Sequence, residues 1–189
     1  LNIPLESNYY PSSYLQLGFS HLFDGLDHIL FIFGLLFCIS GFINIIKTIT
    51  AFTIAHSITL IFGGLGYITI SPHIIEVIIA ASIIWIGFEN LFRKKIKVSR
   101  LGVIFTFGLI HGLGFASMFK LKELEGTDFY LNLLSFNIGI ELGQLITLLP
   151  LIILIPLFNR LSWYRILIAM PASIIIALFG VEMFIDRIL

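Results

Sequence analysis

Six long apolar stretches limit what this chain can fold into more than any other feature of its sequence. A transmembrane helix needs about 20 mostly apolar residues, and we expect spans at residues 19–39, 46–67, 72–92, 101–119, 131–158 and 163–185. Only 12% of the residues are charged, about half of the usual share in a soluble globular domain. The sequence therefore predicts an all-α, polytopic membrane protein, a bundle of about six transmembrane helices that forms a single domain over residues 1–189.

The basic residues are distributed unevenly between the two sides of such a bundle. With six spans, eight of the 11 lysines and arginines fall on one side, including the run between residues 93 and 100, and three fall on the other. Positive charge marks the cytoplasmic side, so we expect both termini to lie outside. The formal net charge of zero argues against a nucleic-acid partner that is bound by electrostatic attraction.

The first predicted span opens with polar side chains that a lipid interior disfavours. The stretch HLFDGLDH places His21, Asp24, Asp27 and His28 within two helical turns. At about 100° per residue, His21, Asp24 and His28 share one narrow sector of the helix, and Asp27 projects beside it. Neutral imidazole and carboxylate oxygen are common ligands of Zn, Ni, Co and Mn. The stretch therefore predicts a site for a divalent metal ion.

Further polar candidates occur in the next four predicted spans. These candidates are His56, Ser57, Glu76, His111, Asn137, Glu141 and Gln144. Glu141 has no basic residue within a span to pair with, so its carboxyl group is either protonated or faces a cation. Most of the candidates lie in the outer half of the membrane, with His56 and His111 near its middle. We therefore expect one polar cavity that opens to the outside and has these two histidines at its floor.

Polar residues near the outer loops receive a plainer interpretation. His73 follows Pro72 in a predicted outer loop, where we expect solvent to hydrate it. Glu182, Asp186 and Arg187 lie near the outer end of the last span, and we assign them to the membrane interface.

Five sequence blocks, taken together and in order, resemble the HupE/UreJ family of hydrogenase and urease accessory membrane proteins. The resemblance covers residues 14–144. The blocks are the H-x5-D-H pattern formed by His21, Asp27 and His28, then FTIAHSITL, IEVIIAASI around Glu76, FGLIHGLGFA and FNIGIELGQ. The fourth block lacks the paired histidines of the hydrogenase-linked members, which places this chain nearer to a sister branch.

The resemblance implies a secondary permease for nickel or cobalt that supplies metalloenzyme maturation, in the inner (cytoplasmic) membrane of a bacterium. By the same resemblance, His21, Asp27, His28, His111 and Glu141 are ligands or pathway groups. For a permease we expect metal ligands at His21, Asp24, Asp27, His28, His56, Glu76, His111 and Glu141. Ser57, Asn137 and Gln144 would then supply weaker ligands along the pathway.

Two other interpretations of the same residues stay open. One is an intramembrane zinc-dependent hydrolase that acts on a lipid or peptide, with Glu76 or Glu141 as general base. The other is a scaffold subunit of a larger membrane complex that binds no metal. Zinc and manganese suit the ligand types as well as nickel and cobalt do, and the oligomeric state also stays open.

Overall fold

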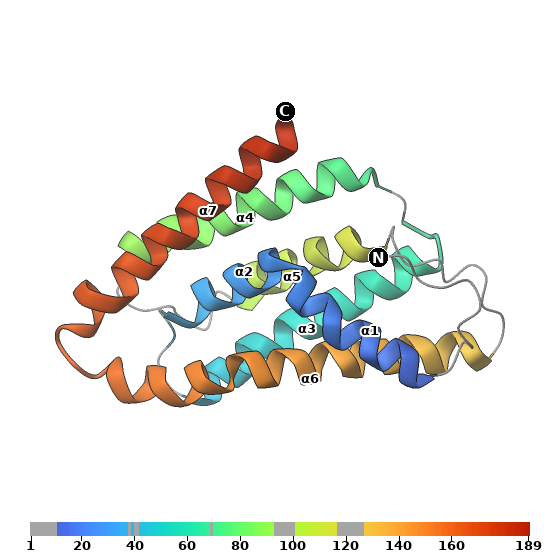
Figure 1. The fold of residues 1–189 in the computed structure, drawn as a ribbon, viewed down its shortest axis with the longest axis horizontal. Helices are drawn as coiled ribbons and strands as arrows, with labels where there is room; N and C mark the ends of the chain where they lie inside the picture. Colours follow the sequence, from blue (N-terminus) through green and yellow to red (C-terminus); the bar gives the residue numbers. More distant parts are fainter. Residues whose placement is uncertain (1–10, 38, 40–41, 69, 93–100, 117–126) are drawn as a thin grey trace.

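The fold is taken from a computed structural model, which describes residues 11–37, 39, 42–68, 70–92, 101–116 and 127–189. All regular secondary structure in these ranges is helical, which confirms the all-α class. The elements in chain order are α1 (Pro11–Asp24), α2 (Leu26–Phe37), α3 (Phe42–Gly64), α4 (Pro72–Phe92), α5 (Leu101–Ala116), α6 (Thr127–Phe158), the π-helical turn η3 (Arg165–Ala169) and α7 (Met170–Ile188). Figure 1 shows them as an elongated bundle.

Four helices are long and apolar enough to cross a membrane: Phe42–Gly64, Pro72–Phe92, Tyr130–Phe158 and Arg165–Ile188. This confirms a polytopic membrane protein. Neither of the two remaining predicted spans is a single long helix. The first is a bent helix pair, α1 and α2, which would make a fifth span if the pair is counted as one. The fourth is the shorter apolar helix α5, whose predicted end at Phe119 lies outside the described residues.

The first predicted span breaks at Gly25, where α1 and α2 meet at an angle of 65°. The amide of Gly25 still donates to the carbonyl of His21 at 3.0 Å, and its carbonyl accepts from the amide of His28 at 3.2 Å. A Cβ at Gly25 would lie 3.0 Å from Nδ1 of His28 and 3.3 Å from the carbonyl oxygen of His21. Glycine is a common cause of sharp helix bends, and here it also leaves room for the His28 ring.

Three helix pairs build the bundle: α1 with α6, α3 with α5, and α4 with α7. In each pair, a Cβ added at a glycine would collide with the backbone of the other helix. These glycines are Gly18 and Gly139 in the first pair, Gly108 and Gly112 in the second, and Gly87 and Gly180 in the third. Because lipid is as apolar as the protein interior, close packing through small residues is a main source of helix association in membranes.

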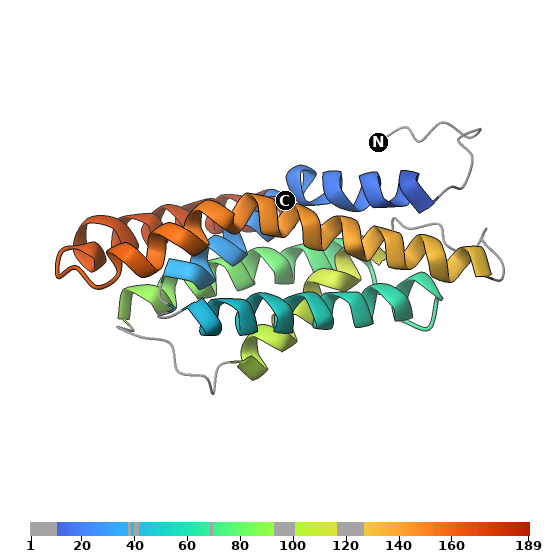
Figure 2. The ribbon, with the colours of Figure 1, turned by 90° about the horizontal axis from the view of Figure 1, so that it is seen from below.

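The residues that face each other give the direction of each pair. Gly108 faces Phe52 and Gly112 faces His56, so α3 and α5 run parallel. The same comparison makes α1 and α6 parallel, and α4 and α7 antiparallel. Figure 2 shows α1 lying along α6. These directions agree with six segments that cross in alternation, if α1 and α2 together are the first.

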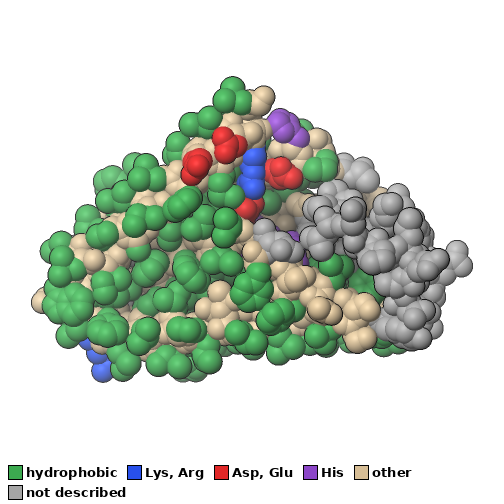
Figure 3. Space-filling view, viewed as in Figure 1, with side chains coloured by type: hydrophobic (Ala, Val, Ile, Leu, Met, Phe, Trp, Pro, Cys, Tyr) green, Lys and Arg blue, Asp and Glu red, His purple; other side chains and the backbone are tan. Residues whose placement is uncertain are grey.

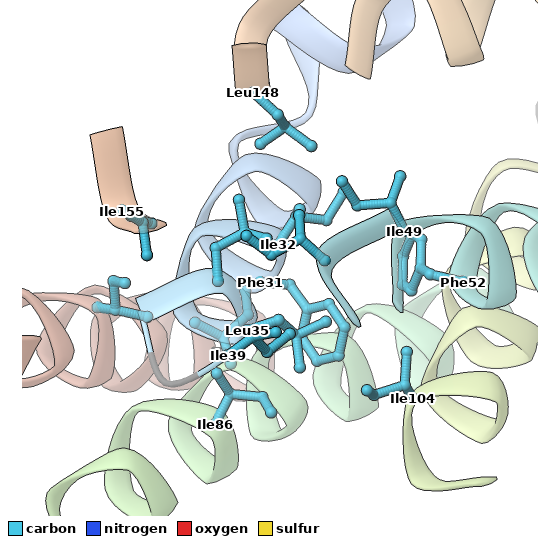
Figure 4. Packing of buried hydrophobic residues seen from close by; sticks show 14 of the residues in the cluster. Phe31, Ile32, Leu35, Ile39, Ile49, Phe52, Ile86, Ile104, Leu148 and Ile155 are labelled. Carbon is cyan, nitrogen blue, oxygen red and sulfur yellow. The ribbon is translucent and has the colours of Figure 1, made fainter. Parts of the chain in front are cut away.

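The short helix α2 lies at the centre of the bundle. Its Phe31, Ile32 and Leu35 are at most 2% exposed, and Figure 4 shows them packed near Phe52 of α3 and Ile86 of α4. The outer surface is also apolar, as Figure 3 shows for the face turned to the viewer. An apolar interior and an apolar exterior are what a bundle surrounded by lipid requires.

Hydrogen bonds from polar side chains join α4 to α2 and to η3. Asn90 of α4 donates from Nδ2 to the carbonyl of Gly34 in α2 at 2.7 Å. Arg165 of η3 donates from Nη2 to the carbonyl of Leu91 in the last turn of α4 at 3.0 Å. The last carbonyls of a helix lack partners within the helix and carry partial negative charge, so a guanidinium there is favourable.

Candidate metal site

Four histidines from four helices converge beside the break between α1 and α2. We call them the histidine cluster: His21 of α1, His28 of α2, His56 of α3 and His111 of α5. The ring centroid of His28 lies 5.0 Å from that of His21, 5.4 Å from that of His56 and 5.0 Å from that of His111. His28 is therefore the central member. Residues that lie up to 90 positions apart in the sequence share one site because α2 is enclosed by the other helices.

Three members of the cluster offer nitrogens to one small volume. One ring nitrogen from each of His21, His28 and His56 lies within 4.8 Å of the other two. Nitrogens bound to one zinc ion at about 2.0–2.1 Å lie about 3.3 Å apart in tetrahedral geometry. Small rotations of the rings would therefore bring the three nitrogens to bonding distance of a single ion.

The imidazole nitrogens at the centre of the cluster lack hydrogen-bond partners. His28 is 7% exposed and His56 is 2% exposed, and among the described residues neither ring nitrogen of either side chain has a hydrogen-bond partner. A buried polar group without a partner is costly. A metal ion would provide the missing partner, and neutral imidazole is a common metal ligand.

His111 is held from the opposite side by a serine that the sequence did not single out. Oγ of Ser82 donates to the carbonyl of Ile79 at 2.6 Å and lies 3.2 Å from Nε2 of His111. Because a hydroxyl has only one proton, this network assigns the Nε2 proton to His111, which donates it to Ser82. Nδ1 of His111 then keeps its lone pair for a proton or a metal.

A layer of phenylalanines lies directly beneath the histidines. This phenylalanine layer consists of Phe31, Phe52 and Phe107, with the Phe31 ring centroid 5.4 Å from each of the other two. The ring of His111 lies 4.8 Å from that of Phe31 and 5.3 Å from that of Phe52. On its helix, each phenylalanine is one turn further than a clustered histidine from the break at Gly25. On this side, the histidine rings therefore border on a group of aromatic rings.

Among the side chains that the structure describes, no acidic candidate belongs to the three-histidine group. Oδ2 of Asp27 lies 2.7 Å from Nη2 of Arg187 in an ion pair. Glu76 and Glu141 are exposed, the first near the start of α4 and the second on α6. The side chain of Asp24 lies outside the described part of the chain. Ligand roles for these four carboxylates stay predictions. Arg187, which we expect at the membrane interface, is the ion-pair partner of Asp27.

The predicted pathway residues are paired with other side chains. Oγ of Ser57 donates to Oδ1 of Asn137 at 2.7 Å. Oγ1 of Thr53 lies 2.8 Å from Oε1 of Gln144. Both contacts join α3 to α6, and both place polar groups side by side between helices. In this arrangement the residues serve as helix contacts, and a role in an ion pathway stays a prediction.

The sequence interpretation missed three features of this region. Ser82 lies alone in an apolar run, and Arg187 is separated from Asp27 by 160 positions, so neither offers a local signal. The phenylalanine layer does have one: FTIAH and FGLIH repeat a phenylalanine four residues before a histidine. On a helix this spacing stacks the two rings on the same face.

The family comparison agrees with the resemblance noted in the sequence. The model of the family described as HupE / UreJ protein matches residues 3–187. No curated protein and no solved structure matched the chain. The match extends over nearly the whole chain and includes every member of the histidine cluster, so this protein belongs to the HupE/UreJ family.

Proposed function

We propose that this protein is a membrane permease or binding protein for a divalent transition metal ion, nickel or cobalt, which binds at the histidine cluster. The observation that carries the proposal is the set of three ring nitrogens, from His21, His28 and His56, that lie within 4.8 Å of one another. Membership in a family of hydrogenase and urease accessory proteins supports a role in metal handling.

The ligand types favour a borderline metal ion. Imidazole nitrogen suits Zn, Cu, Fe and Ni, whereas thiolate and thioether select copper(I). Nickel and cobalt follow from the family, and zinc suits the same three nitrogens. The metal is the cargo of the proposed permease, so its site has to bind the ion and also release it.

The layering of the site suits a transporter whose inner side is closed. The phenylalanine layer lies on the side of the histidine cluster that leads towards the end of α4 and the start of α5, the side that we assign to the cytoplasm. With both termini outside and the protein in a bacterial inner membrane, an ion would approach from the other side. Conduction would then require the phenylalanines to move.

Metal titration of purified protein in lipid nanodiscs tests the proposal. We expect Ni²⁺ or Co²⁺ to bind wild-type protein by calorimetry, and His28→Ala and His56→Ala to abolish binding while the protein still elutes as a folded species. His73→Ala is the matched control, because His73 is exposed on α4 and lies outside the cluster. Full binding by the folded His28→Ala variant would remove the basis of the site.

A zinc-dependent hydrolase is the second candidate, and one observation favours it. Three histidines that leave a fourth position for water are a known catalytic zinc arrangement. Both carboxylates that we considered as general base, Glu76 and Glu141, are exposed and stand apart from the three-histidine group, which weighs against it. Elemental analysis separates the candidates: a tightly held equivalent of zinc supports the hydrolase, and exchangeable nickel or cobalt supports the permease.

A further inference from the structure

One guanidinium joins three helices beside the histidine cluster. Nη2 of Arg187, in the last turn of α7, lies 2.7 Å from Oδ2 of Asp27 in the first turn of α2. Nη1 of Arg187 donates to the carbonyl of Glu76 near the start of α4 at 2.9 Å. The side chains of Arg187 and Asp27 are only 20% and 16% exposed. The next residue after Asp27 is His28, the central member of the cluster.

We propose that Arg187 is a positioning residue that withholds the Asp27 carboxylate from the histidine cluster until a divalent cation displaces it. The inference rests on the proposed metal binding at the cluster and adds a control of that binding. In the metal-free protein, Asp27 forms its ion pair with Arg187. When an ion binds, the Asp27 carboxylate leaves Arg187 and contacts the ion, and the guanidinium becomes exposed at the solvent-facing end of the bundle.

The charges explain why such an exchange of partners is favourable. Three neutral imidazoles leave both positive charges of a divalent ion uncompensated, which is costly in a medium of low dielectric constant. A carboxylate in or next to the shell compensates one of these charges, and Asp27 is adjacent in sequence to a cluster member. Arginine stays protonated and has no lone pair for a metal. Arg187 therefore cannot bind the ion and competes with it for the same carboxylate.

The surroundings of the ion pair attract cations. Glu76, Glu182 and Asp186 are exposed on α4 and α7, the helices that Arg187 joins. Figure 3 shows acidic side chains gathered around a basic one near the C-terminal end of α7, on a face that is otherwise mostly hydrophobic. A concentration of negative charge raises the local concentration of cations. An ion that collects there meets the Asp27–Arg187 pair next to the histidines.

A purely structural contact makes a different prediction from this exchange. If Arg187 only held the helices together, replacing it would loosen the site and weaken metal binding. If Arg187 withholds Asp27, replacing it with neutral glutamine frees the carboxylate and strengthens metal binding. The sign of the change in affinity therefore distinguishes the two roles.

The experiment is a double-mutant cycle, with Ni²⁺ titrated by calorimetry into the full chain in nanodiscs. We expect Arg187→Gln to lower the Kd about tenfold, because the ion no longer has to displace the guanidinium from Asp27; a tenfold change corresponds to about 1.4 kcal/mol. Asp27→Asn is expected to raise the Kd, and adding Arg187→Gln to it is expected to recover little. Arg165→Gln is the matched control, because Arg165 also donates to a helix carbonyl but lies in η3, which precedes α7.

The outcomes separate this inference from the function on which it rests. A wild-type chain that binds no Ni²⁺ overturns both. If the wild-type chain binds Ni²⁺ but folded Arg187→Gln has an unchanged or higher Kd, only the inference is overturned. The same holds if Arg187→Gln raises the affinity equally in the wild-type chain and in Asp27→Asn. A second measurement needs no variant: labelling of Arg187 by phenylglyoxal, followed by mass spectrometry, is expected to speed up when Ni²⁺ is added, with exposed Arg160 as reference. Slower or unchanged labelling of Arg187 contradicts the release of the guanidinium.

Discussion

Replacing Gly112 with alanine tests whether the contact between α3 and α5 sets the geometry of the histidine cluster. A Cβ at Gly112 would lie 2.8 Å from the carbonyl carbon of His56 and closer still to the carbonyl oxygen. Ordinary contact begins at 3.4 Å, so the two helices have to separate by about 0.6 Å or more. A backbone carbonyl cannot rotate out of the way as a side chain can. The change therefore moves His56 relative to the rest of the cluster.

The expected cost can be estimated from overpacking. Adding atoms to a packed interior costs about 1–3 kcal/mol, and alanine returns at most about 1 kcal/mol through its higher helix propensity. For a chain of this size, each kcal/mol lowers the Tm by about 2–4 °C. Metal–ligand distances vary by only about 0.2 Å, so a displaced His56 ring has to move further to reach the ion. We therefore expect weaker Ni²⁺ binding by about 10- to 100-fold, the range for mutations that disturb the support of metal ligands.

The assay compares Gly112→Ala with Gly102→Ala on the same helix. A Cβ at Gly102 would meet nothing within 4 Å, so this control keeps wild-type affinity and gains up to about 1 kcal/mol of stability. Thermal unfolding and Ni²⁺ calorimetry are measured for both variants in nanodiscs. If the two variants match in Tm and in Kd, the close approach of α3 and α5 does not position His56, and the reasoning fails.

Two further substitutions test the barrier and the polar helix contacts. Phe52→Ala opens the phenylalanine layer, so we expect faster passive Ni²⁺ flux into proteoliposomes with little change in Kd. Flux at the wild-type rate would show that this layer is not the barrier. Gln144→Leu removes the contact with Thr53, and we expect a loss of about 0.6 kcal/mol, the average for such bonds between membrane helices, at an unchanged Kd. A tenfold rise in Kd would instead assign Gln144 to the ion pathway.

Much of the architecture was predictable because lipid imposes simple rules. Long apolar stretches have to be helical, since a backbone in lipid satisfies its hydrogen bonds only within a helix or a closed barrel. Four of the six predicted spans are single long helices. The break at Gly25 was harder to predict, because glycine is frequent within membrane-spanning helices and also serves close helix packing there, as at Gly108 and Gly112. The length of the first span alone did not reveal two helices.

The sequence by itself determined the helical class, the membrane environment and the histidines as exceptional residues, because length, hydropathy and the cost of buried polarity are local properties. Only the tertiary structure decided which polar groups meet. In the structure four histidines lie together, Asp27 forms an ion pair with Arg187, Ser57 donates a hydrogen bond to Asn137, and Glu141 is exposed on α6. The physical reason is that partner choice depends on how helices rotate and approach one another. That choice is made by contacts between residues far apart in the chain, such as the glycine contacts between α3 and α5.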